Sequence, residues 1–182
     1  CQCRRQRQMC IRDSIMTVDF PNKHFLINGE WVCSNTEIDL INPSTGDVIA
    51  QVSEANNEHV NDAVGVAKDT LENTWKDITA RERSTLLSKL GRLIEENYDV
   101  LASLEATDVG KPLRQAQADV KALARYMEFY AGAADKLHGD TIPYLKDYTV
   151  YTLREPHGVC AHIIPWNYPM QIIGRSVGAA LA

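Results

Sequence analysis

Two runs of alternating hydrophobic and polar residues lie near the beginning of the chain, and each is interrupted by turn-forming residues. Asn28-Gly29 divides the run 25–32, and both of its residues tolerate the positive φ angles of a tight hairpin turn. The segment 42–46, Asn-Pro-Ser-Thr-Gly, divides the next run, whose hydrophobic positions are Ile38, Leu40, Val48, Ile49 and Val52. The pattern predicts two successive β-hairpins.

Hydrophobic residues then recur every three or four positions, which is the spacing of one face of an α-helix. Four helices are predicted, and we expect their hydrophobic faces to pack in the core. Thr79 and Glu82 have the spacing of a capping box at the start of the second helix, and Gly110 ends the third. The four faces are Val60, Val64, Ala67 and Leu71; Leu86, Leu90, Leu93 and Ile94; Leu101 and Leu104; and Ala116, Val120, Leu123, Met127 and Tyr130.

The last third of the sequence predicts strands, a loop and a helix. Tyr148–Glu155 alternates weakly, as an exposed or edge strand does. Val159–Ile164 is almost continuously apolar, which is typical of a strand buried on both faces. The proline-bounded loop Pro165–Pro169 leads into a helix that runs to Ala182 without a C-cap or breaker, so the pattern suggests a truncated chain and half of a βαβ unit.

The composition is that of a globular protein, with 45% hydrophobic and 24% charged residues among 182. The net charge is −5; because four arginines and one aspartate give residues 1–14 a charge of +3, residues 15–182 carry −8. This acidic body argues against nucleic-acid binding, which needs a basic face. The sequence also contains no apolar segment of membrane-spanning length and no apolar signal-peptide core.

Five cysteines are present, at positions 1, 3, 10, 33 and 160. An odd number is a poor basis for a disulfide framework, so we expect a cytoplasmic protein. No histidine or second cysteine pair completes a metal site with the first three. Residues 1–14 match nothing that follows in composition, and we expect a non-native or disordered tail before a natural start at Met16.

The loop that follows Ile164 is the best candidate for a functional site, because ligands of open α/β sheets bind beyond the carboxyl ends of the strands. The side-chain NH₂ of Asn167 can donate a hydrogen bond to an oxyanion that develops during a reaction. Asn167 is equally well explained as a loop residue that tolerates unusual φ angles, and spacing alone does not separate these interpretations. Gly174 and Gly178 lie inside the final helix, so the glycine fingerprint of a dinucleotide site is absent from the sequence.

Other polar residues are better explained structurally. Cys160 lies in the predicted buried strand, where a thiol is usually inert. It does not form a metal site with His157 and His162, because on a strand Cys160 and His162 face one way and His157 the other. Asp108 is expected at a helix end, and Glu105, on the same helix, is expected to be solvated. We predict no metal site.

The segment 163–169, Ile-Ile-Pro-Trp-Asn-Tyr-Pro, closely resembles the aldehyde dehydrogenase superfamily, as does Arg-Glu-Pro-His-Gly-Val at 154–159 just before it. Four further segments resemble that family in the same order: 25–32, 41–46, 104–112 and 130–143. The resemblance therefore covers roughly residues 20–182, the whole body of the chain.

The resemblance implies an α/β fold that is the N-terminal part of a Rossmann-like cofactor-binding domain, with β-hairpins, a helical section and an oligomerisation arm. Residues 15–138 would form the hairpins and helices. Residues 139–157 would form the arm, which pairs with a neighbouring subunit. Residues 158–182 would form the first strand, loop and helix of the Rossmann-like core.

The family oxidises an aldehyde to a carboxylic acid with NAD or NADP through a cysteine thiohemiacetal. By resemblance, Asn167 is the catalytic oxyanion-hole donor. The resemblance also implies a small-molecule aldehyde as substrate and a homo-oligomer in the full-length protein, without a nucleic-acid or membrane partner. The residues expected to line the cofactor cleft are Ile163, Ile164, Pro165, Trp166 and Asn167.

The nucleophilic cysteine and the general-base glutamate of the family correspond to positions beyond Ala182. Cys160 does not replace the nucleophile, because it precedes the Asn167 motif in a strand. We therefore expect a fragment of an oxidoreductase that is inactive alone. The alternative is a non-catalytic structural or binding protein derived from the same fold. The coding sequence beyond Ala182 separates the two, since a stop codon there would favour the second.

Overall fold

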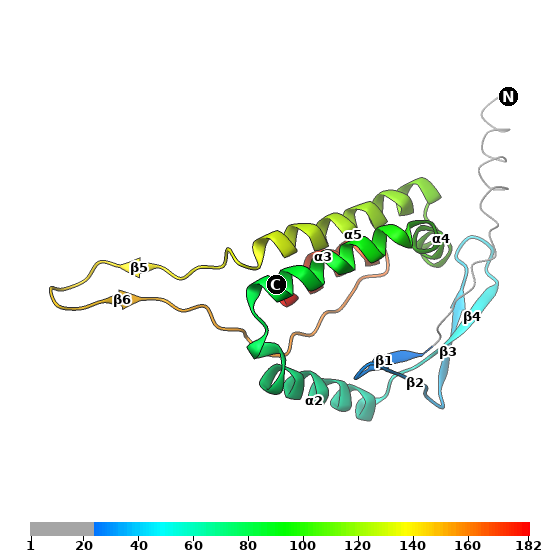
Figure 1. Ribbon diagram of the computed structural model, residues 1–182. Coiled ribbons are helices and arrows are strands. Elements are labelled where there is room, and N and C mark those ends of the chain that lie inside the picture. Colours follow the sequence, from blue (N-terminus) through cyan, green and yellow to red (C-terminus); the bar gives the residue numbers. More distant parts are fainter. Residues whose placement is uncertain (1–23) are drawn as a thin grey trace.

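The computed structural model describes residues 24–182. The predicted tail 1–14, its cysteines and the start at Met16 lie outside the described residues. In Figure 1, two hairpins and the first helix lie on one side of a group of packed helices, and a long arm extends away from the end of that group.

Both predicted hairpins are confirmed. Strand β1 (Phe25–Ile27) pairs antiparallel with β2 (Glu30–Val32), and β3 (Glu37–Ile41) pairs antiparallel with β4 (Val48–Ser53). The φ angles are 53° at Asn28 and 78° at Gly29, which is the left-handed backbone that a tight hairpin turn requires. The asparagine–glycine pair therefore sets the register of the first hairpin.

The predicted helices are all present. After α2 (Asn57–Asn73) comes a single 3-10 turn, η1 (Trp75–Asp77), and then α3 (Ala80–Glu96), α4 (Tyr98–Val109), α5 (Leu113–Ala133) and α6 (Pro169–Leu181). The capping box is formed, because the Glu82 carboxylate accepts a hydrogen bond from the Thr79 backbone N–H at 2.8 Å. Gly110 ends α4 with a φ of 72°, and Asp108 lies at that helix end as expected.

Helix α5 is the centre of the packing and contacts α3, α4 and α6. Close approach of α6 depends on two glycines. A Cβ atom on Gly174 would lie 2.8 Å from Tyr126 Cδ2, and one on Gly178 would lie 2.8 Å from Tyr130 Cδ2. The missing side chains thus let α6 lie against the tyrosine side chains of α5. The buried core consists of Leu87, Ile94, Ala102, Ala116, Val120, Leu123, Ala124, Met127, Ala131 and Met170.

The expected core faces of α2 and α3 are partly wrong. In α3, Leu86, Leu90 and Leu93 are exposed, and the buried positions are Leu87, Gly91 and Ile94, which face α5. In α2, no residue is buried, and Val60 and Val64 are about half exposed, at 54% and 49%. The physical reason is that α5 covers only one face of α3, and no described element covers the other.

The predicted buried strand Val159–Ile164 is not formed. This segment has no strand assignment, Val159 is exposed, and the Ile163 side chain is 96% exposed. A strand is stabilised by hydrogen bonds to a neighbouring strand. Among the described residues, every strand pairs within its own hairpin, so none is available to pair with this segment. Cys160, expected to be buried in that strand, is exposed as well.

The predicted strand Tyr148–Glu155 is present only as β6 (Val150–Tyr151), which pairs with β5 (Thr141–Ile142). The two strands form the arm that extends away from the helices in Figure 1. Apart from the partly buried Val150, its side chains are exposed, as expected for an edge strand, and they include Tyr144 and Leu153 at 68% and 72% exposure. The arm lies within the range 139–157, and its pairing with another subunit stays a prediction.

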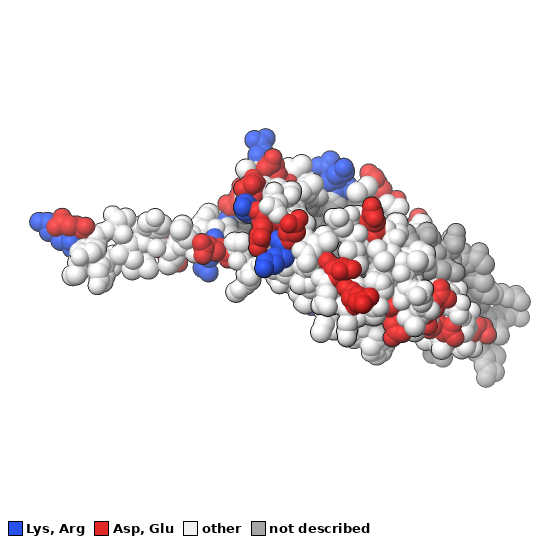
Figure 2. Space-filling model, turned by 90° about the horizontal axis from the view of Figure 1, so that it is seen from below, with Lys and Arg blue, Asp and Glu red and all other residues white. Residues whose placement is uncertain are grey.

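The surface agrees with the acidic composition. On the face that Figure 2 shows, acidic side chains predominate, and basic groups lie singly or beside acidic ones. This distribution lacks the basic stripe that a nucleic acid would need on that face. Among residues 24–182, no helix has the length and apolar character needed to span a membrane.

Substitution of Gly174 by alanine tests the close packing of α6 on α5. The added methyl group would press on Tyr126 and Leu123, so we expect a loss of about 1–3 kcal/mol in unfolding free energy. Gly132→Ala is the matched control, because nothing lies within 4 Å of its added Cβ and alanine favours helix by up to about 1 kcal/mol. Urea unfolding followed by circular dichroism measures both; equal effects would contradict the packing argument.

Candidate active site

The site is built around the N-terminus of α6. Pro169 is the first helical residue, a position that suits its fixed φ angle and missing N–H. Asn167 and Tyr168 immediately precede it and reach a pocket of about 380 Å³. Asn167 therefore lies at an open pocket beside the start of this helix. The lining residues are Gln115, Asn167, Tyr168, Gln171, Ile172 and Arg175.

Of the five predicted site residues, Asn167 alone lines this pocket. Ile163 and Trp166 lie on the preceding segment with their side chains 96% and 80% exposed. Pro165 is also exposed, and Ile164 is half-buried. The structure thus places the polar candidate, which is itself exposed, at an open surface pocket, and leaves the four apolar candidates on the surface beside it.

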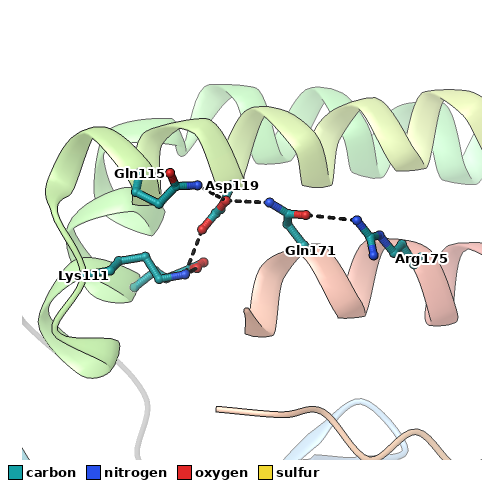
Figure 3. A network of polar contacts seen from close by, with 6 residues as sticks. Lys111, Gln115, Asp119, Gln171 and Arg175 are labelled. Atoms are coloured by element: carbon teal, nitrogen blue, oxygen red, sulfur yellow. Dashed lines mark hydrogen bonds and ion pairs between the residues drawn. The ribbon is translucent and has the colours of Figure 1, made fainter. Parts of the chain in front are cut away.

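The Asp119 carboxylate joins α6 to α5 through the pocket-lining residues Gln115 and Gln171 (Figure 3). It is fully buried and accepts three hydrogen bonds. Lys111 Nζ, in the connection between α4 and α5, donates at 2.8 Å. Gln115 Nε2 donates at 3.0 Å from the first turn of α5, and Gln171 Nε2 donates at 2.7 Å from α6. Because these bonds outweigh the opposing effect of burial, they hold the pKa of Asp119 below its usual range.

Lys111 connects this carboxylate to a second one. Its ammonium group forms ion pairs with Asp119 and with Glu105, whose side chains are both fully buried. Burial alone would lower the pKa of Lys111, but its hydrogen bonds to the two carboxylates raise it. The same ammonium lies 4.5 Å from the centre of the Tyr168 ring, a cation–π contact with the loop that carries Asn167.

Glu105 was expected to be solvated, and this expectation is wrong, because the residue is only 2% exposed. Its helix packs on α5, and Lys111 supplies the counter-charge that permits burial. Burial raises the pKa of Glu105, and the hydrogen bond and charge of Lys111 only partly oppose this. Its Oε2 atom has no hydrogen-bond partner among the described residues.

Arg175 also lines the pocket. Its Nε donates to the Tyr126 hydroxyl at 2.8 Å, and its Nη2 donates to Gln171 Oε1 at 3.2 Å. The polar chain in Figure 3 therefore continues from Lys111 through Asp119 and Gln171 to Arg175. The two bonds join the exposed guanidinium to α5 and to Gln171.

Sequence reasoning missed the polar residues of this network. The available signal was helical spacing, since Gln115 and Asp119 are four residues apart, as are Gln171 and Arg175. Polar side chains aligned on a helix that is otherwise packed indicate a polar interface. Among residues 24–182, no group of three metal-ligating side chains is found.

The comparisons with known proteins agree with one another. The sequence matches the model of the aldehyde dehydrogenase family over residues 31–182. The mitochondrial aldehyde dehydrogenase family 2 member B4 of Arabidopsis thaliana is 42% identical over 170 residues, 91% of this chain and 32% of the relative. Human mitochondrial aldehyde dehydrogenase is 42% identical over 168 residues, which cover 90% of this chain and 32% of that relative.

Solved structures show the same fold. The NAD⁺ complex of aldehyde dehydrogenase from Bacillus cereus has a TM-score of 0.85 at 42% identity, covering 88% of this chain and 33% of that one. An NADP-dependent enzyme from Escherichia coli has a TM-score of 0.85 at 36% identity, and the match covers 88% of this chain and 34% of that one. The chain belongs to the aldehyde dehydrogenase family. The predicted α/β fold is thereby confirmed, and the chain spans about a third of the length of the curated relatives it matches.

Replacement of Lys111 by methionine tests the buried ion cluster. Two buried carboxylates would lose their counter-charge, so we expect a loss of about 3–5 kcal/mol in unfolding free energy near pH 7.5. The loss should shrink as the pH falls, because the pKa of Glu105 is raised and protonation of its carboxyl removes the cost of burying that charge, whereas Asp119, whose pKa is lowered, stays ionised.

Lys136→Met is the matched control for this measurement. Lys136 pairs with Asp135, but both side chains are more than half exposed, at 64% and 58%, so its removal should cost less than about 1 kcal/mol. Urea unfolding at several pH values gives the unfolding free energy of each variant as a function of pH. A Lys111 variant whose deficit stayed constant with pH would contradict the assignment of buried, ionised carboxylates.

Proposed function

We propose that the chain is the N-terminal portion of an NAD(P)-dependent aldehyde dehydrogenase, in which Asn167 donates a hydrogen bond to the oxyanion formed from an aldehyde. The observation that carries the proposal is that the amide-bearing residue lines a polar pocket at the N-terminus of α6 in a member of this family. The reaction class is the oxidation of an aldehyde to a carboxylic acid, and the substrate is a small aldehyde.

The role of Asn167 follows from its surroundings. A side-chain NH₂ stabilises negative charge on a carbonyl oxygen most effectively when it is held in place before the reaction. Pro165 and Pro169 restrict the backbone on both sides of Asn167, and the cation–π contact of Lys111 holds the neighbouring Tyr168 ring. The N-terminus of α6 adds a favourable dipole for developing negative charge.

The residues before Asn167 fit part of a dinucleotide cofactor. Ile163, Ile164, Pro165 and Trp166 offer a largely exposed, mostly apolar surface beside the pocket, which suits contact with a planar ring system. These side chains carry no cation for the pyrophosphate, so they would hold the ring and not the phosphates. When bound, NAD or NADP accepts the hydride that leaves the substrate carbon.

The arm formed by β5 and β6 supports an oligomeric protein. Its exposed aromatic and aliphatic side chains include Tyr144, Tyr148 and Leu153, and an edge strand offers unpaired backbone groups. We propose that it pairs with a second subunit in a homo-oligomer. The acidic body supports the absence of a nucleic-acid partner. From the cysteine usage, we propose a cytoplasmic location. We propose no membrane partner.

The chain by itself should be inactive. Its two described cysteines, Cys33 and Cys160, are both exposed, and neither lines the pocket that holds Asn167. We therefore expect the purified 182-residue chain to form no NADH or NADPH from an aldehyde above the rate of a blank. Absorbance at 340 nm with millimolar aldehyde and cofactor measures this. Cofactor reduction that depends on both aldehyde and protein would contradict the fragment assignment.

Asn167→Ala in the complete enzyme tests the oxyanion role. Removal of one such donor typically lowers kcat by about 100–1,000-fold, and KM should change much less because the ground-state carbonyl is bound weakly. Asn61→Ala, on the exposed surface of α2, is the matched control and should retain full activity. A kcat for the Asn167 variant within a factor of about three of the control would rule out the role.

A further inference from the structure

The residue that precedes α6 lacks the support that a helix start usually has. Tyr168 occupies the N-cap position, and no side-chain hydrogen bond caps the helix there. Serine, threonine, aspartate and asparagine are the usual N-cap residues, because their side-chain oxygen accepts a bond from the first turn. The Tyr168 carbonyl accepts a bond from the Ile172 N–H at 3.1 Å, but this bond leaves the Tyr168 side chain unconstrained. What holds the Tyr168 ring therefore bears on how the start of α6 is placed.

A largely buried cation holds that ring. The Lys111 ammonium lies 4.5 Å from the centre of the Tyr168 ring, and the Lys111 side chain is only 9% exposed. Cation–π attraction is stronger where water is excluded than on an open surface. Lys121, which is exposed, lies 5.5 Å from the centre of the Tyr98 ring. The contact of Lys111 is thus both closer and drier than that of Lys121.

Two buried carboxylates hold the ammonium in turn. Lys111 Nζ donates hydrogen bonds to Glu105 and to Asp119, whose side chains are fully buried. Asp119 also accepts a hydrogen bond from Gln171, in the first turn of α6, at 2.7 Å. Lys111 is therefore linked to α6 at two points, through the Tyr168 ring and through Asp119.

The backbone that carries Lys111 is restricted on both sides. Gly110, before it, has a φ of 72°, and a Cβ atom there would lie 2.6 Å from Pro43 Cγ, so the connection packs closely on the turn of the second hairpin. Pro112, after it, has its φ fixed by its ring and directly precedes α5. The Lys111 side chain is therefore anchored at both ends, by a rigid backbone and by buried carboxylates.

We infer that Lys111 is a positioning residue for Asn167: by holding the Tyr168 ring, it fixes the direction in which the neighbouring amide points. The inference rests on the proposed function, in which that amide meets the aldehyde oxygen. Asn167 and Tyr168 share a peptide bond, so a shift of the Tyr168 backbone is passed on to the amide. Lys111 is absent from the lining of the pocket, so it acts through Tyr168 and not on the substrate.

Replacement of Lys111 by methionine in the complete enzyme tests the inference. A misplacement of about 1 Å in an active site can cost about 100-fold in rate. We therefore expect kcat to fall by about 10–100-fold and KM to change by less than about 3-fold, since no residue of the pocket lining is removed. Lys121→Met is the matched control, because it removes a lysine beside a tyrosine ring away from the pocket lining. A similar kcat in the two variants would overturn the inference.

A double-mutant cycle separates positioning from a general structural defect. If Lys111 acts through Asn167, Lys111→Met should lower kcat by less than about 2-fold once Asn167 is already alanine, because residues that act together are not additive. A structural defect would lower kcat by the same factor in both backgrounds, and that result would overturn the inference. Lys111→Arg keeps the charge and can stack on the ring, so it should recover part of the kcat lost in Lys111→Met.

Changes to the ring keep the inference testable if Lys111→Met does not fold. Tyr168→Phe retains an aromatic face for the ammonium, whereas Tyr168→Leu removes it and leaves both carboxylates of the ion cluster in place. We expect kcat to be at least about 10-fold higher in Tyr168→Phe than in Tyr168→Leu. Equal values of kcat in these two variants would overturn the inference.

The order of the Asn167 backbone gives a readout that needs no activity. In the 182-residue chain, ¹⁵N relaxation should give an order parameter of about 0.85 at Asn167, and below about 0.6 in Lys111→Met. The amides of α3 and α5 should stay near 0.85 in both proteins, which shows that the helices remain folded. An unchanged order parameter at Asn167 in Lys111→Met would overturn the inference.

Failure of the proposed function is distinguishable from failure of this inference. If Asn167→Ala leaves kcat of the complete enzyme unchanged, the proposed oxyanion role fails, and a loss of order at Asn167 in Lys111→Met would still show the structural link. If Asn167→Ala lowers kcat and Lys111→Met does not, the positioning role of Lys111 alone is overturned.

Discussion

The arrangement of the site depends on one buried carboxylate. Asp119 is inaccessible to solvent, and a buried carboxylate is tolerated only when hydrogen bonds and a counter-charge compensate for the lost hydration. Its three donors come from three segments: Lys111 from the connection between α4 and α5, Gln115 from the first turn of α5, and Gln171 from α6. Any displacement of α6 would leave this charge incompletely compensated. The carboxylate therefore specifies where the first turn of α6 lies.

The position of α6 in turn determines what its N-terminus presents. Gly174 and Gly178 let the helix lie against the tyrosine side chains of α5, and Gln171 fixes its rotation by bonding to Asp119. With the rotation set, Asn167 and Arg175 both reach the pocket. Packing, a buried ion cluster and a row of polar side chains thus act together to bring an amide and a guanidinium to one pocket.

Local patterns predicted most of the elements. The asparagine–glycine turn, the Thr79–Glu82 capping box and the end of α4 at Gly110 are specified by residues close together in the sequence, and all three are present. What depended on distant partners was predicted less well. The strand expected at Val159–Ile164 needs neighbouring strands that the described residues do not supply, and the expected core face of α3 was wrong because periodicity cannot tell which side another helix will cover.

The site residues, too, were predicted where the signal is local and missed where it depends on distant partners. Asn167 was identified from its loop and from the family motif, and the structure brings it to a pocket. Glu105, Lys111 and Asp119 were not identified as a cluster, because a charged residue is ordinarily solvated and its burial depends on a partner from another segment. Arg175 was missed for the same reason, since only the packing of α6 on α5 turns it toward the cavity that holds Asn167.

The most direct test of this account is a crystal structure of the complete enzyme with an aldehyde bound. The account predicts that Asn167 Nδ2 lies about 2.7–3.1 Å from the aldehyde oxygen, while Gln171 still donates to Asp119. A structure in which the Asn167 amide points into solvent, or in which the aldehyde oxygen is bound while α6 has separated from Asp119, would contradict it.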